Sequence, residues 1–431
     1  MKWDVTVIGG GLAGLVSAVW LARAGQSVLL VERSNQLGGR AATEEQAGCF
    51  FNRGAHALYN KGAGRKILEE LGVVIDGGAA GTRLQFMHEG NLEVFPGSPL
   101  AFLTSRFFSW KEKKAFVRLM MQISNLKADE SNHLSLADWA CENVENEKVR
   151  KVFLALCRLA TYCSQLDIAS AGAVIRQFRR SLGGVTYLHG GWQSLIDQLR
   201  VKAVEAGVTI RVNHSVVEIS GTYPDMVVAF ANQQAVTTRH VISTADPKST
   251  CRLVKHAAGT QLAALADALV PVKAACLDLA LKRLPEPACV FVLDLDRPYY
   301  YSNHSSAARL TRDPAHAVIH LVKYLDAESE HEPVKNRAEL EAFLTAIQPG
   351  WQKEVIGQQY LPAMTVSHGI VTARKLPWGN KGSAVADIPG LYVAGDWLTY
   401  DGMLADASLS SAKAAALSIM EKESGKEAVL T

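Results

Sequence analysis

Residues 5–14 read Val-Thr-Val-Ile-Gly-Gly-Gly-Leu-Ala-Gly, a short apolar run followed by a Gly-x-Gly-x-x-Gly turn. An uncharged stretch continues to Ala22, a second apolar run covers residues 27–31, and Glu32 closes that run. Strand, glycine turn, helix, strand and acid in this order predict a dinucleotide-binding βαβ unit. In such a unit the pyrophosphate lies at the positive N-terminal end of the helix, and the acid accepts hydrogen bonds from ribose hydroxyls.

The glycines of this turn have separate expected roles. Gly9 permits the tight turn, Gly11 lets the backbone approach the pyrophosphate, and Gly14 lets the helix pack closely on the strand. A signal peptide or membrane anchor is the alternative for the uncharged stretch, but neither explains the second strand and its acid. We therefore expect the cofactor contacts of this unit to be Gly9, Gly11, Leu12, Ala13, Gly14 and Glu32.

Two further motifs stand far apart in the chain. The first, Leu37-Gly38-Gly39-Arg40, comes just after Glu32. The second, residues 389–396, reads Pro-Gly-Leu-Tyr-Val-Ala-Gly-Asp and precedes Asp401-Gly402-Met403-Leu404 and an alanine-rich helix expected over residues 405–420. Together with the βαβ unit, these motifs resemble the FAD site of the large flavoprotein family that includes amine oxidases, protoporphyrinogen oxidase and phytoene desaturase.

The resemblance implies a role for each motif. In the family, the Gly-Gly-Arg segment lies beside the phosphates and isoalloxazine of FAD, and the late Gly-Asp pair meets the ribityl chain and pyrophosphate. The last helix points its N-terminus at the pyrimidine edge of the flavin, and backbone at the position of Val216 or Val217 holds the adenine. The further FAD contacts implied are Arg33, Gly38, Gly39, Arg40, Val217, Gly395, Asp396, Gly402, Met403 and Leu404.

The same resemblance implies an α/β fold in which a Rossmann-type FAD-binding domain carries an inserted α+β substrate-binding domain. The FAD-binding domain is expected to be assembled from residues 1–72, 190–246 and 384–431, and the substrate-binding domain from residues 73–189 and 247–383. Periodicity in the first insert is mostly helical, whereas residues 272–281 and 317–325 read as strands and residues 335–347 as an amphipathic helix.

Composition agrees with this organisation and excludes several classes of protein. A chain of 431 residues, 48% hydrophobic, can bury the cores of two domains. A net charge of +3 gives no indication of a nucleic-acid partner. The seven cysteines contain no Cys-x-x-Cys pair, so no metal site or redox disulfide is expected, and reduced thiols indicate a cytoplasmic protein.

Cysteine positions also bear on how the cofactor is held. No cysteine follows Cys289, so the cysteinyl-flavin link that some amine oxidases make near their C-terminus cannot form, and non-covalent FAD is expected. No second complete Gly-x-Gly-x-x-Gly unit is present, because Gly62-Ala63-Gly64-Arg65 lacks the strand and the acid. Electrons are therefore expected to come from an organic substrate and to leave to oxygen, a quinone or another acceptor.

Few residues are needed for the chemistry itself, because a flavin carries the hydride. The chain passes near the flavin after the Gly-Gly-Arg loop in the family, which makes His56 the candidate acid or base; packing on the ring is the alternative role. Asn52 stands where the family often has an aspartate. Candidate residues of the substrate pocket are Tyr59, Arg374 and Trp397.

The function that these features imply is an FAD-dependent oxidoreductase. It would take a hydride from a largely apolar small molecule, as a desaturase, dehydrogenase or oxidase similar to phytoene desaturase or protoporphyrinogen oxidase. The alternatives are a flavin amine oxidase and a non-catalytic protein whose FAD is structural.

Residues 102–126 have two interpretations. Phe107, Phe108, Trp110 and Phe116 alternate with arginine and lysine residues, as in a helix that lies at a membrane surface. A cap helix with its apolar stripe packed on the substrate domain is the other interpretation, and the low net charge favours it. Peripheral membrane contact stays open, since many relatives take lipid-soluble substrates.

Overall fold

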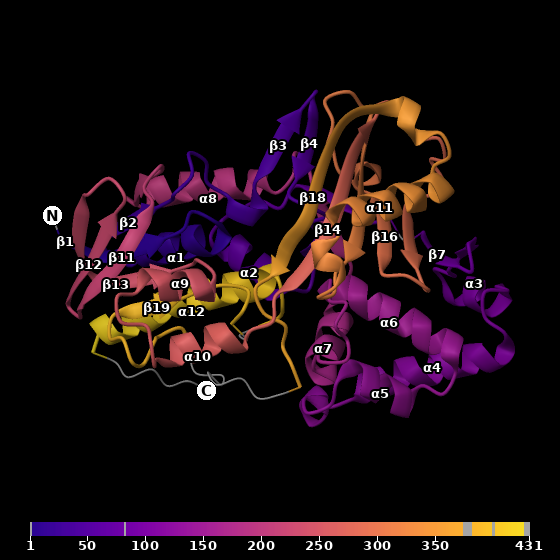
Figure 1. Ribbon diagram of the computed structural model, residues 1–431, viewed down its shortest axis with the longest axis horizontal. Coiled ribbons are helices and arrows are strands. Elements are labelled where there is room, and N and C mark those ends of the chain that lie inside the picture. The colour runs from indigo at the N-terminus through magenta and orange to yellow at the C-terminus, as the bar shows by residue number, and fades with distance from the viewer. Residues whose placement is uncertain (1, 82, 374–381, 399–400, 426–431) are drawn as a thin grey trace.

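Two sheets with their covering helices stand side by side in the computed structural model, which describes residues 2–81, 83–373, 382–398 and 401–425 (Figure 1). One seven-stranded sheet contains both the first strand and the last strand of the chain. The other seven-stranded sheet is built from residues 272–367, apart from two neighbouring strands at one end of it that come from residues 84–94. This mixed α/β architecture confirms the predicted fold class.

The first sheet is parallel at its centre. β1 (Lys2–Ile8) lies between β2 (Val28–Val31) and β13 (Ala235–Ser243), and all three run in the same direction. β10 (Thr209–Arg211) extends the sheet beside β2, and β19 (Leu391–Val393) pairs with β13. The sheet continues on the antiparallel side through β12 (Asp225–Phe230) and β11 (Val216–Thr222).

Helices cover both faces of this sheet, so its central strands are buried apolar runs. One face packs against α1 (Leu12–Arg23), α8 (Gln193–Glu205) and α12 (Ala405–Glu423). The other face packs against α9 (Pro247–Leu253) and α10 (Gln261–Ala268). The N-terminus of α1 follows the glycine turn directly, as expected of a βαβ unit.

The second sheet has the strand order β18, β14, β17, β16, β15, β7, β8. Its strands are β14 (Val272–Leu281), β15 (Phe291–Asp294), β16 (Tyr299–Asn303), β17 (Ala317–Tyr324), β18 (Val355–Ser367), β7 (Leu84–His88) and β8 (Asn91–Val94). α11 (Pro333–Ile347) covers one face. The strands predicted at residues 272–281 and 317–325 and the helix at 335–347 are confirmed.

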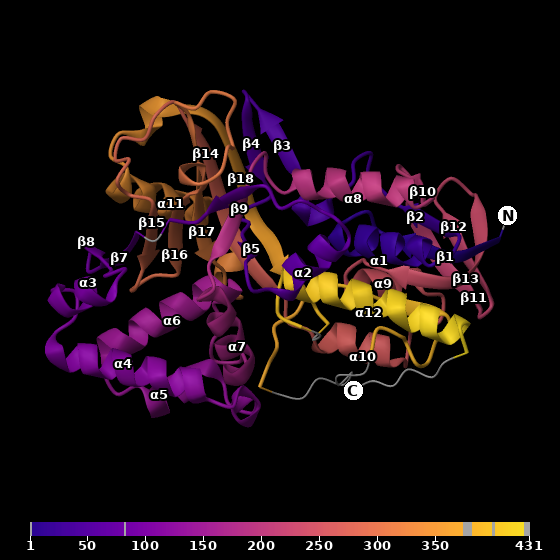
Figure 2. The same cartoon turned by 180° about the vertical axis from the view of Figure 1, so that it is seen from behind.

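A helical layer covers the other face of the second sheet and contributes to its core (Figure 2). It consists of α3 (Pro99–Thr104), α4 (Trp110–Asn125), α5 (Leu136–Asn143), α6 (Glu147–Thr161) and α7 (Ala171–Ser181). The mostly helical prediction for the first insert holds for this layer. It missed β7 and β8, which are too short to show a clear period and are held by pairing with β15.

Short elements connect the two halves of the molecule. They are β3 (Thr43–Gln46), β4 (Cys49–Asn52), β5 (Leu58–Tyr59), α2 (Ala63–Glu70), β6 (Gly77–Ala79) and β9 (Val185–Leu188). β5, β9 and β6 form a three-stranded sheet, and β3 and β4 form a hairpin. Across the described ranges, none of the helices combines the length and apolarity needed to cross a membrane.

Candidate cofactor and active site

A large cavity lies where the two halves meet and has a volume of about 1690 Å³. Sites for one small ligand typically measure roughly 300–1,000 Å³, so this cavity has room for a dinucleotide and a second molecule. Its two ends differ in chemistry. One is lined by the glycine turn, the Gly-Gly-Arg loop and the start of α12; the other is lined by Leu84, Phe95, Phe116, Met120, Leu156, Leu159, Phe178, Phe291 and Leu361.

The glycine turn and the Gly-Gly-Arg loop lie side by side at this first end, where the Gly38 amide donates to the Gly10 carbonyl at 2.9 Å. A Cβ atom added at Gly11 would meet only the Gly38 carbonyl oxygen, at 3.7 Å, and one added at Gly39 would meet only the Gly11 Cα, at 3.8 Å. The protein therefore leaves space beside both backbones that side chains would fill. Such a cradle at a helix N-terminus fits a pyrophosphate.

The other two glycines of the turn serve packing. A Cβ at Gly14 would lie 1.9 Å from the Gly9 carbonyl oxygen, which would push α1 away from β1. Gly9 itself has a φ of +105°, a left-handed conformation that favours glycine, and its Cβ would lie 2.3 Å from Thr244 Oγ1. Leu12 and Ala13, the first residues of α1, line the cavity beside them.

Glu32 lies at the carboxyl end of β2 and is almost fully buried while lining the cavity. Its Oε2 accepts a hydrogen bond from the Gly10 amide at 2.8 Å, and its Oε1 accepts one from the Ser34 amide at 2.9 Å. The Ser34 hydroxyl also donates to Oε1, at 3.0 Å. These bonds fix the carboxylate, and Oε2, which accepts one of them, keeps acceptor capacity for a ribose hydroxyl. Arg33, the next residue, also lines the cavity.

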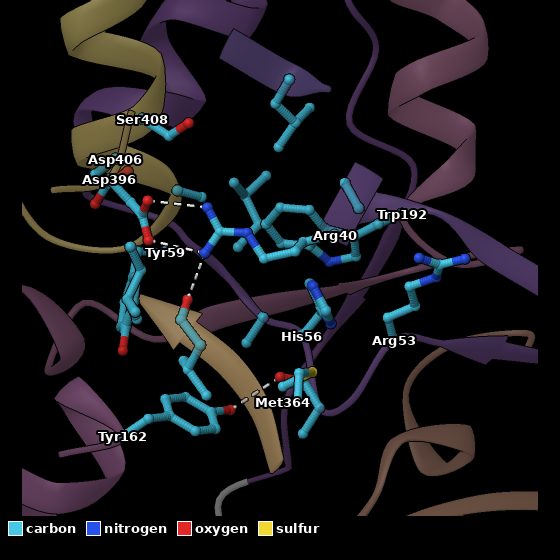
Figure 3. A pocket seen from close by; sticks show the side chains of 18 of the residues that line it. Arg40, Arg53, His56, Tyr59, Tyr162, Trp192, Met364, Asp396, Asp406 and Ser408 are labelled. Atoms are coloured by element: carbon cyan, nitrogen blue, oxygen red, sulfur yellow. Dashed lines mark hydrogen bonds and ion pairs between the residues drawn. The ribbon is translucent and has the colours of Figure 1, made fainter. Parts of the chain in front are cut away.

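Arg40 and Asp396 join the two distant motifs of the sequence. Their side chains form a bidentate ion pair, with Nη1 to Oδ2 at 2.8 Å and Nη2 to Oδ1 at 2.9 Å (Figure 3). The backbone amide and Nδ1 of His368 donate to the same carboxylate at 3.1 and 3.0 Å. Burial alone would raise the pKa of Asp396, but the Arg40 guanidinium and the hydrogen bonds from His368 and Arg40 hold it well below its usual range.

Asp406 lies in the first turn of α12 and lines the same end of the cavity. Its Oδ1 accepts a hydrogen bond from the Gly64 amide at 2.8 Å, near the start of α2, whereas its Oδ2 is buried without a partner. Burial raises the pKa of Asp406 to about 6, against the effects of the Gly64 amide and Arg180. The sequence predictions missed this residue; an acid at the start of the alanine-rich helix was the available signal.

We expect Asp406 to make the stability of the protein depend on pH. The folded state holds a proton here up to about pH 6, whereas an unperturbed aspartate releases it near pH 3.8. The free energy of unfolding therefore falls as pH rises through this window, on the order of 2–3 kcal/mol in total. Urea unfolding of the flavin-free protein between pH 4 and pH 7.5 should show the decline, and Asp406→Asn should flatten it.

A matched control for this prediction is Asp197→Asn, which changes an exposed carboxylate on α8. It should leave the decline intact. If the unfolding free energy of Asp406→Asn falls with pH in parallel with that of the wild type, the buried carboxyl is not the source of the decline.

His56 and Tyr59 both line the cavity (Figure 3). His56 Nδ1 lies 2.9 Å from the Gly54 carbonyl oxygen, and its ring meets Trp192 edge-on at a centroid distance of 5.1 Å. Because a carbonyl only accepts, Nδ1 carries the proton. Burial lowers the pKa of His56 below its usual value, so the neutral ring offers Nε2 as an acceptor. Tyr59 donates its hydroxyl to the Ala160 carbonyl at 2.9 Å.

Several predicted site residues do not line the large cavity. Val216 lines the cavity rather than Val217, whose side chain is exposed. Gly395 lies behind the cavity wall, where its amide donates to Ser411 Oγ at 3.0 Å. Gly402 and Met403 line a separate cavity of about 30 Å³ next to Asp396, and Leu404 lines both cavities.

Trp397 was predicted to line the substrate pocket, but it does not line the large cavity. Its side chain is buried and lines the small cavity rather than the large one. The reason is the local turn: the indole packs back on Gly395, where an added Cβ would lie 2.5 Å from Trp397 Nε1. Arg374, the third residue predicted for the substrate pocket, lies outside the described residues.

A buried polar row crosses the second sheet behind the cavity. Ser302, His320, Asp278 and Gln359 stand directly opposite one another on β16, β17, β14 and β18. His320 Nδ1 lies 2.7 Å from Asp278 Oδ1, and Gln359 Nε2 donates to Asp278 Oδ2 at 3.0 Å. Both His320 and Asp278 have no exposed surface. Among the described side chains, no group of His, Cys, Asp or Glu could hold a metal ion.

Comparison with known proteins agrees with this geometry. Residues 12–253 match the family model described as flavin containing amine oxidoreductase. The chain is 25% identical over 248 residues to 4,4'-diapolycopen-4-al dehydrogenase from Metabacillus indicus, covering 49% of each protein. It is 33% identical over 106 residues to 15-cis-phytoene desaturase from Narcissus pseudonarcissus, covering 24% of this chain and 17% of that one.

These matches span about half, or less, of the length of the relatives. The fold is matched over more of the chain. An oxidoreductase from Methanosarcina mazei has a similar structure with a TM-score of 0.78 and 20% identity, covering 97% of this chain and 100% of that one. The family match covers more than half of the described sequence and includes Glu32 and the Gly-Gly-Arg loop. The chain belongs to the family of flavin-containing amine oxidoreductases.

Proposed function

We propose that this protein is an FAD-dependent oxidoreductase that takes a hydride from a largely apolar small molecule. One observation carries the proposal: a single cavity joins a dinucleotide cradle at one end to an apolar chamber at the other. The cradle belongs to the FAD-binding domain that we assign to residues 1–72, 190–246 and 384–431. The chamber belongs mainly to the substrate-binding domain assigned to residues 73–189 and 247–383.

FAD fits the residues at the first end. The backbones of Gly11 and Gly39 would hold the pyrophosphate, Glu32 the ribose, and Val216 the adenine side. Arg40, fixed by Asp396, would lie beside the flavin, and the N-terminus of α12 would face its pyrimidine edge. None of the seven cysteines is among the described residues that line the large cavity, which supports non-covalent binding.

Bound FAD would supply the hydride acceptor. The chain would place the substrate, exclude water from the apolar chamber, and take up any proton lost with the hydride. His56 is the candidate for that proton, because Gly54 holds hydrogen on Nδ1 and leaves Nε2 free on a neutral ring. We further propose oxygen or a quinone as the electron acceptor and, since all seven cysteines are free, a cytoplasmic location.

Anaerobic bleaching of the purified yellow protein tests the proposed reaction. Polyenes, porphyrinogens and amines would be added separately, and the flavin absorbance followed by stopped flow. Bleaching by a polyene or porphyrinogen is the expected result, and bleaching by amines alone would make the protein an amine oxidase. Bleaching only by dithionite would leave a structural FAD. With a bleaching substrate, His56→Gln should slow the reaction without loss of flavin; an unchanged rate would limit His56 to packing.

Glu32→Ala should weaken FAD binding by roughly 10- to 100-fold, because it removes the ribose acceptor and the bond that fixes the Gly10 amide. Fluorescence titration of the flavin-free protein with FAD measures the effect. Glu218→Ala is the control, since Glu218 lies exposed on β11 of the same sheet. Equal affinity in both variants would remove Glu32 from the cofactor site.

A further inference from the structure

Exposed apolar side chains are concentrated in one short part of the molecule. Six of the twelve large hydrophobic residues that are exposed in the described ranges lie between Val94 and Met121. Those on α3 and α4, which we call the α3–α4 surface, are Leu100, Leu103, Trp110, Val117 and Met121, with exposed fractions of 73, 54, 67, 42 and 63%. Both helices lie at the end of the molecule farthest from β1 (Figures 1 and 2). Concentration of this kind marks an interaction surface.

α4 has two apolar sides, and only one belongs to the core. Phe116, Leu119 and Ile123 pack inward with the substrate domain, so the cap-helix interpretation holds for that side. Trp110, Val117 and Met121 recur at helical spacing on the outer side and remain exposed. A cap helix alone needs no outer apolar stripe.

Positive charge accompanies this stripe. Arg106, Lys111, Lys114 and Arg118 are exposed and lie among the apolar residues of the α3–α4 surface. None of the ion pairs between described residues involves any of these four. The only other lysine of α4, Lys113, points inward and donates to the carbonyls of Leu103 and Ser105. The exposed face is therefore both apolar and cationic.

The same segment also forms part of the cavity wall. Phe95, Pro96 and Gly97, just before α3, line the apolar chamber, as do Phe116 and Met120 of α4. The exposed surface and the chamber are therefore separated by the thickness of one helix layer. A molecule that leaves an apolar phase at this surface has a short path to the chamber.

We propose that the α3–α4 surface binds an anionic lipid bilayer and that the apolar substrate reaches the chamber from that bilayer. Aromatic and aliphatic side chains would enter the interface while the four cations meet lipid phosphates. A second copy of the chain fits less well, because a two-fold contact would bring the same four cations together. The route of the substrate rests on the proposed function, whereas bilayer binding does not.

Vesicle flotation with the flavin-loaded protein tests the surface. The protein is mixed with phosphatidylcholine vesicles that contain or lack phosphatidylglycerol, at low and high salt. We expect flotation with the anionic vesicles and release at high salt. The variants Leu100→Ser/Trp110→Ser/Met121→Ser and Lys111→Glu/Lys114→Glu should each lower the partition coefficient by roughly tenfold or more. Val201→Ser/Val204→Ser, on the exposed side of α8, is the control and should float like the wild type.

Three results would overturn the proposal: no flotation of the wild type, flotation of the surface variants equal to the wild type, or a wild-type dimer that both variants convert to a monomer. Retained flavin absorbance shows that a variant is folded. The bleaching assay with a dispersed substrate separates the two proposals. A protein that bleaches but does not float lacks the membrane surface; one that floats but never bleaches lacks the proposed activity.

Discussion

Arg40→Met should lower the free energy of unfolding by about 3 kcal/mol and abolish stable flavin binding. The reason is the carboxylate that remains. Asp396 is 2% exposed and would keep only the donors of His368 after losing both hydrogen bonds from the guanidinium. Urea unfolding of the flavin-free protein measures the change in unfolding free energy, and titration with FAD measures the change in affinity. Arg40→Lys, which keeps the charge but not the bidentate geometry, should fall between wild type and Arg40→Met.

The control for this prediction is Arg312→Met. Arg312 also forms a bidentate pair, with Glu45 at 2.6 and 2.9 Å, but on the surface. Exposed pairs contribute about 0–1 kcal/mol, so this variant should lose little stability. Equal losses in the two arginine variants would show that burial of Asp396 does not set the energy of the pair.

Asp278→Ala should destabilise the protein by about 3–5 kcal/mol. The substitution leaves His320 and Gln359 without their shared acceptor in the middle of a sheet where neither aspartate nor histidine is exposed. The double variant Asp278→Leu/His320→Leu should lose much less, because apolar side chains replace both partners. Unfolding in urea at pH 7 measures each variant.

Asp313→Ala provides the comparison, since Asp313 pairs with His316 at 3.6 Å near the surface. The unfolding free energy of Asp313→Ala should fall by no more than about 1 kcal/mol. A double leucine variant less stable than Asp278→Ala would show that the row provides more than the pairing of two buried groups.

Local patterns predicted the parts of the fold that depend on neighbouring residues. The glycine turn, its flanking strands and Glu32 lie within one stretch of chain, and the structure places them together at one end of the cavity. The motif that ends at Asp396 contains β19, which pairs with β13 in the same sheet. What local pattern could not give was the bond between these segments. Nothing near Arg40 indicates that its partner lies 356 residues away.

The directions in which side chains point were the second feature that the sequence could not predict. Trp397 follows the Gly-Asp pair and was expected to face the substrate, but the turn directs its indole away from the large cavity. His320 and Asp278 each stand in an apolar strand, and their pairing depends on the register between β14 and β17. The outer stripe of α4 is visible as periodicity, yet its exposure depends on which side the substrate domain covers.

The position of Asp396 has a consequence for biogenesis. During synthesis the ribosome releases the glycine turn and Arg40 hundreds of residues before β19 and α12. Until that last segment emerges, Arg40 lacks the carboxylate of Asp396, and the first sheet lacks the strand that pairs with β13. We therefore expect the flavin to be captured late in maturation. A nascent chain interrupted before residue 391 would remain colourless however well its earlier parts had folded.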